Sequence, residues 1–585
     1  MAAPLSFLKK LFLGLTVALV VGLGGFGFLE GGLRLVGFGH SIHFFWDETD
    51  GKGQHWWREN RWVTAPYFPA ELIRRPQVIR LPNPKPANTY RIFVLGSSAA
   101  MGDPEPAFSL ARQLELLLRN AYPGIHFEVA NAGITAINSH VVRALAEDCA
   151  KLQPDLFIVY EGNNEVIGPF GPGTVFSPFL GSSAAIKAGQ WVKSTRSGQL
   201  MAAMARRLGP GKKKLGDWGG MQMFLKNEID RDDPRLATTH ALFRENLRAI
   251  AAAGRGAGAA VFVCTVLTNQ KDFAPFVSHH RFDLTNDEKA KWQTLFDGGT
   301  EEKLRAALVI DDHFAELHFR LGRLCLGYNR LVEAKAFFQQ ALDLDALRFR
   351  TDSKLNQVIR DLAKEGIAVV DLAAAAEKQS PGGIVGDEFL YEHVHLNFPG
   401  TYRVACELFK NISDELIKTG KIGSAVSDVM PLAEMRRRLA YSTYEQAMII
   451  KELQTRFSKA PFAEQSDNAA RLKLYAERGE VAMRILTKPE TKEGLVDFYE
   501  HALAASPGDW MLLRNAGMAY VGLGLAERAL PLLERARALV EEDPDTLFAL
   551  ATAQQKLGQG DVAGKTFARL RELEPRYPGL PSGAK

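Results

Sequence analysis

The pattern of apolar and polar residues changes along this chain, and its first feature is a long apolar run. Residues 11–29 contain a single polar side chain, Thr16, and are flanked by Lys9, Lys10 and Glu30. With a rise of about 1.5 Å per residue, a helix of this length matches the roughly 30 Å hydrocarbon core of a bilayer. A cleaved signal peptide has a similar pattern, but its apolar core is usually shorter. We therefore predict an uncleaved membrane anchor over residues 11–29.

The basic residues beside this run predict the orientation of the anchor. Lys9 and Lys10 precede it, and positive residues next to a span tend to stay in the cytoplasm. Residues 1–10 are thus expected in the cytoplasm, although Arg34 beyond the run opposes this orientation. The bulk of the chain would then be extracytoplasmic, which in a Gram-negative bacterium means the periplasm. The predicted location is the inner membrane, with a single pass.

Short apolar runs further along the chain predict buried strands. Helical patterns separate these runs, and this alternation is typical of a parallel α/β sheet of the doubly wound, flavodoxin-like class. In such a sheet, ligands bind beyond the carboxyl ends of the strands. We therefore expect the functional residues just after the runs, which are residues 90–95, 127–130, 156–160, 260–266 and 367–370.

Four polar blocks occupy the expected positions. They read GSS at 96–98, NAGITA at 131–136, GNNE at 162–165 and EHVHLN at 392–397. A serine hydroxyl becomes a good nucleophile when a neutral imidazole accepts its proton, and a carboxylate holds that imidazole in place. Taken singly, each block has an ordinary structural explanation, such as a serine that caps a helix or a histidine within the core. Taken together, they predict nucleophilic catalysis.

The four blocks, in this order, resemble those of the SGNH hydrolases, the GDSL-like esterase superfamily. The resemblance implies that Ser98 is the nucleophile and His395 is the base. It implies that Glu392 is the acid, with Asp387 as a second candidate because the family has an aspartate three residues before the histidine. His393 is expected to face outward, since it lies two residues from His395.

The same resemblance implies an oxyanion hole. Its donors would be the backbone N–H groups of Ser98 and Ala136 and the side-chain amide of Asn164, with the N–H of Gly133 as the alternative. The family has glycine where this chain has Ala136. An alanine can donate its N–H there provided that the turn does not require a positive φ. Ser97 replaces the aspartate of the family's first block, but that side chain is not one of the triad groups.

Two further segments surround these blocks. Residues 30–88 form an aromatic-rich arm without a clear period, which we expect to pack on the core, with a belt at the membrane interface as the alternative. Residues 166–220 contain a helical stretch directly beyond Asn164. This insertion is interpreted as a lid or substrate-binding element, and a membrane-facing helix is the alternative.

Helical repeats are predicted inside and after the α/β core. The stretch from Ala315 resembles a tetratricopeptide (TPR) repeat, and units starting near Trp510 and Pro544 are offset by 34 residues. Stacked helix pairs of this kind leave a concave surface for a protein partner, although they could also only cover the core. The predicted division is a core at 89–299 and 348–425, inserted helices at 300–347, and C-terminal repeats at 426–585.

Composition and charge limit the other possibilities. The net charge of +4 over 585 residues is too small to predict nucleic-acid binding. The four cysteines, widely spaced, do not form a metal-binding pattern. They are expected to be buried thiols, with a disulfide left open, and no cofactor or metal is predicted.

We thus predict a membrane-anchored, extracytoplasmic serine esterase or O-acyltransferase. Its substrate would be an acyl ester, such as an acetyl ester, of a cell-envelope glycan, and the TPR repeats would bind a protein partner. The substrate class comes from the family resemblance and the predicted location. The alternative is a scaffold without enzymatic activity, in which a degenerate SGNH core carries the repeats; Ala136 and Glu392 favour that alternative.

Overall fold

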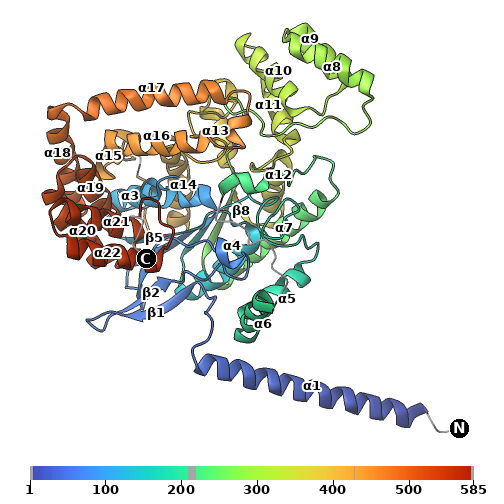
Figure 1. The fold of residues 1–585 in the computed structure, drawn as a ribbon, viewed down its shortest axis with the longest axis vertical. Helices are drawn as coiled ribbons and strands as arrows, with labels where there is room; N and C mark the ends of the chain where they lie inside the picture. The colour runs from blue at the N-terminus through green and yellow to red at the C-terminus, as the bar shows by residue number, and fades with distance from the viewer. Residues whose placement is uncertain (1–3, 209–218, 427–428, 581–585) are drawn as a thin grey trace.

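A computed structural model describes residues 4–208, 219–426 and 429–580 of the chain, and its centre is a parallel sheet (Figure 1). The sheet has five strands in the order β5-β4-β6-β7-β8. This confirms the predicted α/β class with a parallel sheet, and the order is the doubly wound one. The strands are β4 (Thr89–Gly96), β5 (His126–Gly133), β6 (Leu156–Tyr160), β7 (Ala260–Cys264) and β8 (Ala368–Val370).

Burial on both faces explains why the strands are continuous apolar runs. All eight residues of β4 are buried, as expected for a central strand covered by helices on both sides. The chain moves from β4 to β5 in one direction and then returns past β4 to β6. Because such crossovers are right-handed, the connecting helices lie on opposite faces. α3 (Leu110–Ala121) packs with α14 (Phe398–Lys418), and α4 (Ser139–Cys149) packs with α7 (Arg235–Gly256).

The N-terminal arm contains a small antiparallel sheet, which the sequence pattern did not predict. Its strands pair in the order β1-β2-β3. Phe44, Phe45, Tyr67 and Phe68 are buried in the main core, so the predicted packing of the arm is confirmed for these rings. Trp46 remains largely exposed. The strands are β1 (Phe45–Thr49), β2 (His55–Glu59) and β3 (Arg80–Asn83).

The N-terminal helix α1 (Pro4–Leu35) projects away from the body of the molecule (Figure 1). Within the described residues, it is the helix whose length and composition suit a membrane span, from Phe12 to Leu35, and none of that window is buried. It is longer than the predicted run of 11–29. A signal sequence would share these properties.

Helical segments extend the core on several sides (Figure 1). The predicted insertion contains α5 (Ser183–Ser194) and α6 (Arg196–Leu208), while its residues 209–218 lie outside the described residues. Five helices come between β7 and β8: four that pack as neighbouring pairs, and then α12 (Ser353–Asp361), while α13 (Leu372–Gln379) follows β8. These four are α8 (Asn286–Gly298), α9 (Glu301–Ile310), α10 (Ala315–Gly327) and α11 (Leu331–Leu344).

The C-terminal part is entirely helical over its described residues. The last four helices form two closely packed pairs, α19 with α20 and α21 with α22. The pairs bury small and apolar side chains against one another, among them Ala516, Ala529 and Leu533. The helices are α15 (Leu432–Arg438), α16 (Thr443–Phe457), α17 (Asn468–Leu486), α18 (Pro489–Ala505), α19 (Trp510–Gly522), α20 (Ala526–Leu539), α21 (Pro544–Lys556) and α22 (Gly560–Leu573).

Candidate active site

A serine, a histidine and a glutamate form one hydrogen-bonded chain at the carboxyl end of β4. The Oγ atom of Ser98 lies 2.8 Å from Nε2 of His395. The other ring nitrogen, Nδ1, lies 2.7 Å from Oε1 of Glu392. Ser98 and His395 are 297 residues apart in sequence, so the tertiary fold brings them together. Both distances are typical of hydrogen bonds, and the first puts a possible base within reach of a hydroxyl.

The turn after β4 positions the serine. A Cβ atom at Gly96 would lie 2.1 Å from the carbonyl oxygen of Tyr160 on β6, so this position needs glycine. Ser98 is the first residue of the short helix α2 (Ser98–Met101). The N–H groups in the first turn of a helix have no acceptor within that helix, and this holds for the Ser98 N–H at the start of α2.

A tight loop before α14 positions the histidine and the glutamate. The Tyr391 N–H donates to the carbonyl of His395 at 2.8 Å, and Leu390 bridges to Leu396. Oε1 of Glu392 also accepts the backbone N–H of His395 at 2.8 Å. The longer glutamate side chain is thus folded back onto its own loop, which places its carboxylate against the imidazole.

The electrostatics of this pair suit a general base. Burial disfavours the charged form of Glu392, but the neighbouring imidazoles of His393 and His395 hold its pKa well below the usual range. Burial also lowers the pKa of His395, but the carboxylates of Glu392 and Asp103 outweigh it, so that pKa is raised. A carboxylate that stays ionised stabilises the imidazolium formed during proton transfer.

The expectation that His393 faces outward was wrong. The side chain is buried, and its Nδ1 atom contacts Oε2 of Glu392. Phe273, Phe276 and Phe462 surround the ring. Burial outweighs the attraction of Glu392, so the pKa of His393 is lowered. Alternation failed here because residues 390–396 form a loop rather than a strand, and both imidazoles turn toward the two oxygens of one carboxylate.

A second carboxylate, that of Asp103, lies beside Nε2 of His395. Its Oδ2 atom is 3.5 Å from Nε2 of His395, and Arg456 of α16 donates from Nη2 to Oδ1 at 3.0 Å. Burial raises the pKa of Asp103, but Arg456 and His395 reverse this effect, and the pKa lies below its usual value. Sequence reasoning missed both residues. Asp103 follows the nucleophile by five positions and could have been considered, whereas no local pattern indicates Arg456.

The predicted oxyanion donors have different surroundings. Ala136 adopts φ of +61°, the left-handed region that favours glycine. Asn164 is buried, and its Nδ2 donates to the carbonyl of Ile137 at 2.9 Å, a contact that uses one of the two amide N–H bonds. The Gly133 N–H already donates to Oδ1 of Asn131 at 3.1 Å, so this geometry removes Gly133 from the set of free donors.

The second candidate acid does not reach the histidine. Oδ1 of Asp387 accepts a hydrogen bond from Asn269 at 2.9 Å, and its backbone N–H donates to Asp272 at 3.1 Å. Burial and the neighbouring carboxylate of Asp272 raise the pKa of Asp387 to about 6. Glu392 is thus the carboxylate that contacts Nδ1 of His395.

Two buried glutamates behind the site were not predicted. The hydroxyl of Ser97, next to Ser98, bonds to Glu161, and burial raises the pKa of Glu161 well above its usual value. Glu165 accepts the N–H and the hydroxyl of Ser139 at 2.8 and 2.7 Å, and burial raises its pKa to about 7. These contacts tie the turns after β4, β5 and β6 together.

Three side chains that could hold a metal ion already contact one another. Glu392, His393 and His395 have ligand atoms within 4.8 Å of one another, and the contacts among these three groups account for that proximity.

Cys149, Cys264 and Cys325 are buried free thiols, as expected, while Cys406 is half-buried and also free.

A groove of about 620 Å³ lies between the N-terminal sheet and the C-terminal helices. Its lining includes three indoles, those of Trp46, Trp62 and Trp510. Several of its charged groups are paired, such as Arg75 with Glu574 at 3.2 Å. An adjoining groove of about 380 Å³ shares four lining residues with it, so the two follow one seam between the core and the C-terminal helices. The shared residues are Gln77, Val78, Trp510 and Val540.

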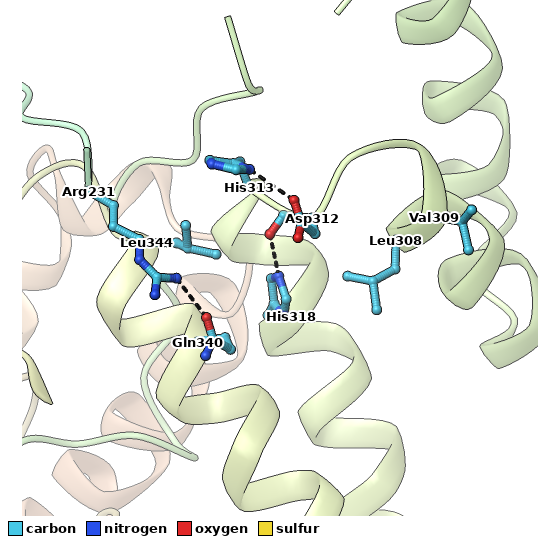
Figure 2. A pocket seen from close by; sticks show the side chains of 8 residues that line it. All are labelled: Arg231, Leu308, Val309, Asp312, His313, His318, Gln340 and Leu344. Atoms are coloured by element: carbon cyan, nitrogen blue, oxygen red, sulfur yellow. Dashed lines mark hydrogen bonds and ion pairs between the residues drawn. The ribbon is translucent and has the colours of Figure 1, made fainter. Parts of the chain in front are cut away.

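A separate pocket of about 460 Å³ lies among the inserted helices, and Figure 2 shows its lining. His318 Nε2 approaches the carbonyl of Asp312 at 2.7 Å, and Nδ1 of His313 lies 2.9 Å from the Asp312 carboxylate. Arg231 donates to Gln340 at 2.8 Å. These polar groups bind one another and join the segment before α7 to α10 and α11, so we interpret the pocket as a structural junction.

Comparisons with known proteins add little to this geometry. No protein-family model matches the sequence, and no curated protein matches it. Among solved structures, an acetyl xylan esterase aligns over 55% of this chain and 99% of its own length, with 13% identity and a TM-score of 0.27. A TM-score of this size does not establish a shared fold, so the site geometry and the sequence motifs carry the functional argument.

Proposed function

We propose that this chain is a serine esterase or O-acyltransferase of the SGNH type. The observation that supports it is the chain of two short contacts from Ser98 Oγ through the His395 ring to Glu392. The three residues occupy the motif positions of that family. A serine, a base and an orienting acid in hydrogen-bond reach are what acyl transfer requires.

In the proposed reaction, His395 Nε2 accepts the proton of Ser98 as Oγ attacks the acyl carbonyl carbon. The C–O bond to the alcohol then breaks, and the imidazolium returns its proton to the leaving oxygen. The resulting acyl-serine is attacked by water in hydrolysis, or by a second alcohol in transfer, with His395 again acting as the base. Glu392 remains ionised throughout and stabilises the imidazolium.

The developing oxyanion would be bound by three donors. These are the backbone N–H groups of Ser98 and Ala136 and the remaining amide hydrogen of Asn164. Removing one such donor typically costs about 10²–10³ in rate. Gly133 is left out because its N–H is already bonded to Asn131.

The groove between the N-terminal sheet and the C-terminal helices supports a glycan as the alcohol part of the ester substrate. Pro106 lines the groove and follows Asp103 by three residues, so their Cα atoms are at most about 11 Å apart. Indole faces can stack on sugar rings, and paired charged groups still offer donors and acceptors to hydroxyl groups. A neutral, polyhydroxylated chain that carries acyl esters therefore fits this groove.

The proposal also includes a membrane anchor and a surface for a protein partner. The apolar helix α1 would anchor the chain in the inner membrane, with the bulk of the chain in the periplasm. The inserted and C-terminal helix pairs would act as TPR repeats that bind a protein partner, with covering of the core as the simpler alternative. The proposed chemistry needs no cofactor.

The decisive experiment measures ester hydrolysis by the full chain. We expect release of nitrophenol from p-nitrophenyl acetate by the wild type and its loss in Ser98→Ala. Ser506→Ala is the matched control, because Ser506 directly follows α18 in the C-terminal helices. Equal background rates in the wild type and Ser98→Ala would instead favour the scaffold without enzymatic activity. The positive φ of Ala136, where the family has glycine, is the observation that favours this alternative.

A further inference from the structure

The hairpin formed by α5 and α6 exposes large apolar side chains. Trp191 is 60% exposed, Met201 57%, Met204 50% and Leu208 79%. At 100° per residue, the three residues of α6 fall within about 60° of one another around the helix, so they share one face. Arg206 lies about 140° from Met201, on the other side.

The hairpin is also strongly basic. Residues 183–208 contain no acidic side chain. An amphipathic element with an apolar face and basic flanks is suited to the surface of a bilayer that contains anionic lipid. Its basic residues are Lys187, Lys193, Arg196, Arg206 and Arg207.

The polar end of α1 is bound to this hairpin. Glu30, which ends the apolar run, accepts the backbone N–H groups of Arg196 and Ser197 at 3.0 and 2.9 Å. Just beyond α1, the His40 N–H donates to Gln199 Oε1 at 2.8 Å. The start of α6 is thus fixed at the level where α1 changes from apolar to polar.

A ring contact places the other helix at a similar level. The rings of Trp191 and Phe26 have centroids 5.9 Å apart. Phe26 precedes Glu30 by four residues, or about 6 Å along the helix axis. If α1 crosses a membrane, Trp191 therefore lies just inside its boundary, where tryptophan is enriched.

We infer that the α5–α6 hairpin lies in the membrane interface, with Trp191, Met201, Met204 and Leu208 at the acyl boundary and Arg206 and Arg207 at lipid phosphates. A protein partner is the less favoured occupant, because the apolar face adjoins the side of α1 that would meet lipid. The inference rests on α1 crossing a membrane and does not depend on the proposed esterase activity.

The hairpin would give the core a second attachment to the membrane. Arg143 of α4 donates to Gln190 of α5 at 3.1 Å, and Ser183 donates to Glu245 of α7 at 2.6 Å. These contacts join the hairpin to helices that cover the parallel sheet. The active site would therefore be held at a fixed height above the bilayer instead of moving freely on a tether.

Fluorescence quenching tests the position of the hairpin. The full chain is placed in vesicles of phosphatidylcholine and phosphatidylglycerol whose acyl chains carry bromine at carbons 6 and 7. We expect bromine to quench a component of the fluorescence that Trp191→Phe removes. In the double variant Met201→Asp, Met204→Asp, bromine should quench much less of the Trp191 fluorescence. The matched control is Val332→Asp, because Val332 is an apolar residue of α11 that is 87% exposed, and it should leave quenching unchanged.

Each alternative has a distinct result. Vesicle flotation without any quenching that depends on Trp191 would show that α1 anchors the chain while the hairpin stays in water, and would overturn the inference. Quenching that persists unchanged in the double variant would overturn the role of the α6 face. Failure of the chain to float with vesicles would remove the anchor and the inference together, while leaving hydrolysis of p-nitrophenyl acetate as a separate question.

Discussion

At the residue scale, the carboxylate of Glu392 determines how the candidate site is arranged. One of its oxygens holds Nδ1 of His395 at 2.7 Å, and the other contacts Nδ1 of His393. The two imidazoles differ in environment, because only His395 also contacts Ser98 and Asp103. Consequently His395 is the ring whose pKa is raised, while His393 is a buried neighbour whose pKa is lowered.

Replacing each carboxylate in turn should show whether Glu392 or Asp387 orients the imidazole of His395. We expect Glu392→Gln to lower kcat for p-nitrophenyl acetate by about 10⁴, because the imidazole loses its orienting carboxylate. The pKa of His395 should also fall. Asp387→Asn is the matched control, since that side chain binds Asn269 instead, and it should change kcat only slightly. A larger loss in Asp387→Asn than in Glu392→Gln would reverse the assignment of the acid.

Ala136 offers a test of backbone strain. An alanine at φ of +61° costs roughly 1–2 kcal/mol relative to glycine, which adopts this region freely. Glycine loses more entropy on folding, by about 0.5–1 kcal/mol. We therefore expect Ala136→Gly to stabilise the protein by up to about 1 kcal/mol in urea unfolding. Ala202→Gly, within α6, should destabilise it, and equal effects of the two changes would argue against strain at Ala136.

The sequence pattern pointed to three residues that contact one another in the structure, but not to the groups around them. Ser98, His395 and Glu392 lie in blocks whose local patterns indicate chemistry. Arg456 lies in an ordinary amphipathic helix and reaches Asp103 only because α16 packs beside the loop after α2. No local spacing encodes such a contact.

At the scale of elements, α16 contributes a charged group to the candidate site. Arg456 binds Asp103, and both groups affect the His395 ring in opposite directions, since the carboxylate raises its pKa and the guanidinium lowers it. A helix of the C-terminal part thereby influences the pKa of a histidine in the core. A ligand or partner that moved α16 would change the basicity of His395.

Two substitutions should shift the pH profile in opposite directions. His395 must be neutral to accept the serine proton, so the rate falls as the pH drops below its pKa. Asp103→Asn removes a negative charge and lowers that pKa, so the acid limb of kcat/KM should move to lower pH. Arg456→Gln removes a positive charge and should move it to higher pH. Arg484→Gln, an exposed arginine of α17, is the control, and shifts of the same sign in both variants would contradict this account.

At the scale of the whole molecule, predictability followed the length and regularity of the pattern. The five parallel strands could be located because each contains an apolar run, and the central strands β4 and β6 are fully buried. The small sheet β1-β2-β3 was missed because its strands are half-exposed and alternate imperfectly, as in the burial of β2 (His55–Glu59). Contacts between the core and the C-terminal helices were unpredictable because single arginines make them across hundreds of residues.

These arginines suggest that the core and the C-terminal helices unfold together. Arg514 of α19 is buried, and it donates to Glu105 of the core at 2.7 Å. Removing one partner of a fully buried ion pair typically costs about 3–5 kcal/mol, and we expect a smaller cost here because the side chain of Glu105 is 24% exposed. We expect Arg514→Leu to lower the unfolding temperature in calorimetry and to separate a C-terminal transition from that of the core.

The matched control is an arginine of the neighbouring helix. Arg528 of α20 is exposed and pairs with Glu500 at 3.6 Å, a type of contact worth about 0–1 kcal/mol. Arg528→Leu should leave a thermogram like that of the wild type. If Arg514→Leu also left it unchanged, the two parts would already unfold independently. The influence of α16 on His395 would then have to act through the Asp103 contact alone, without a shared cooperative unit behind it.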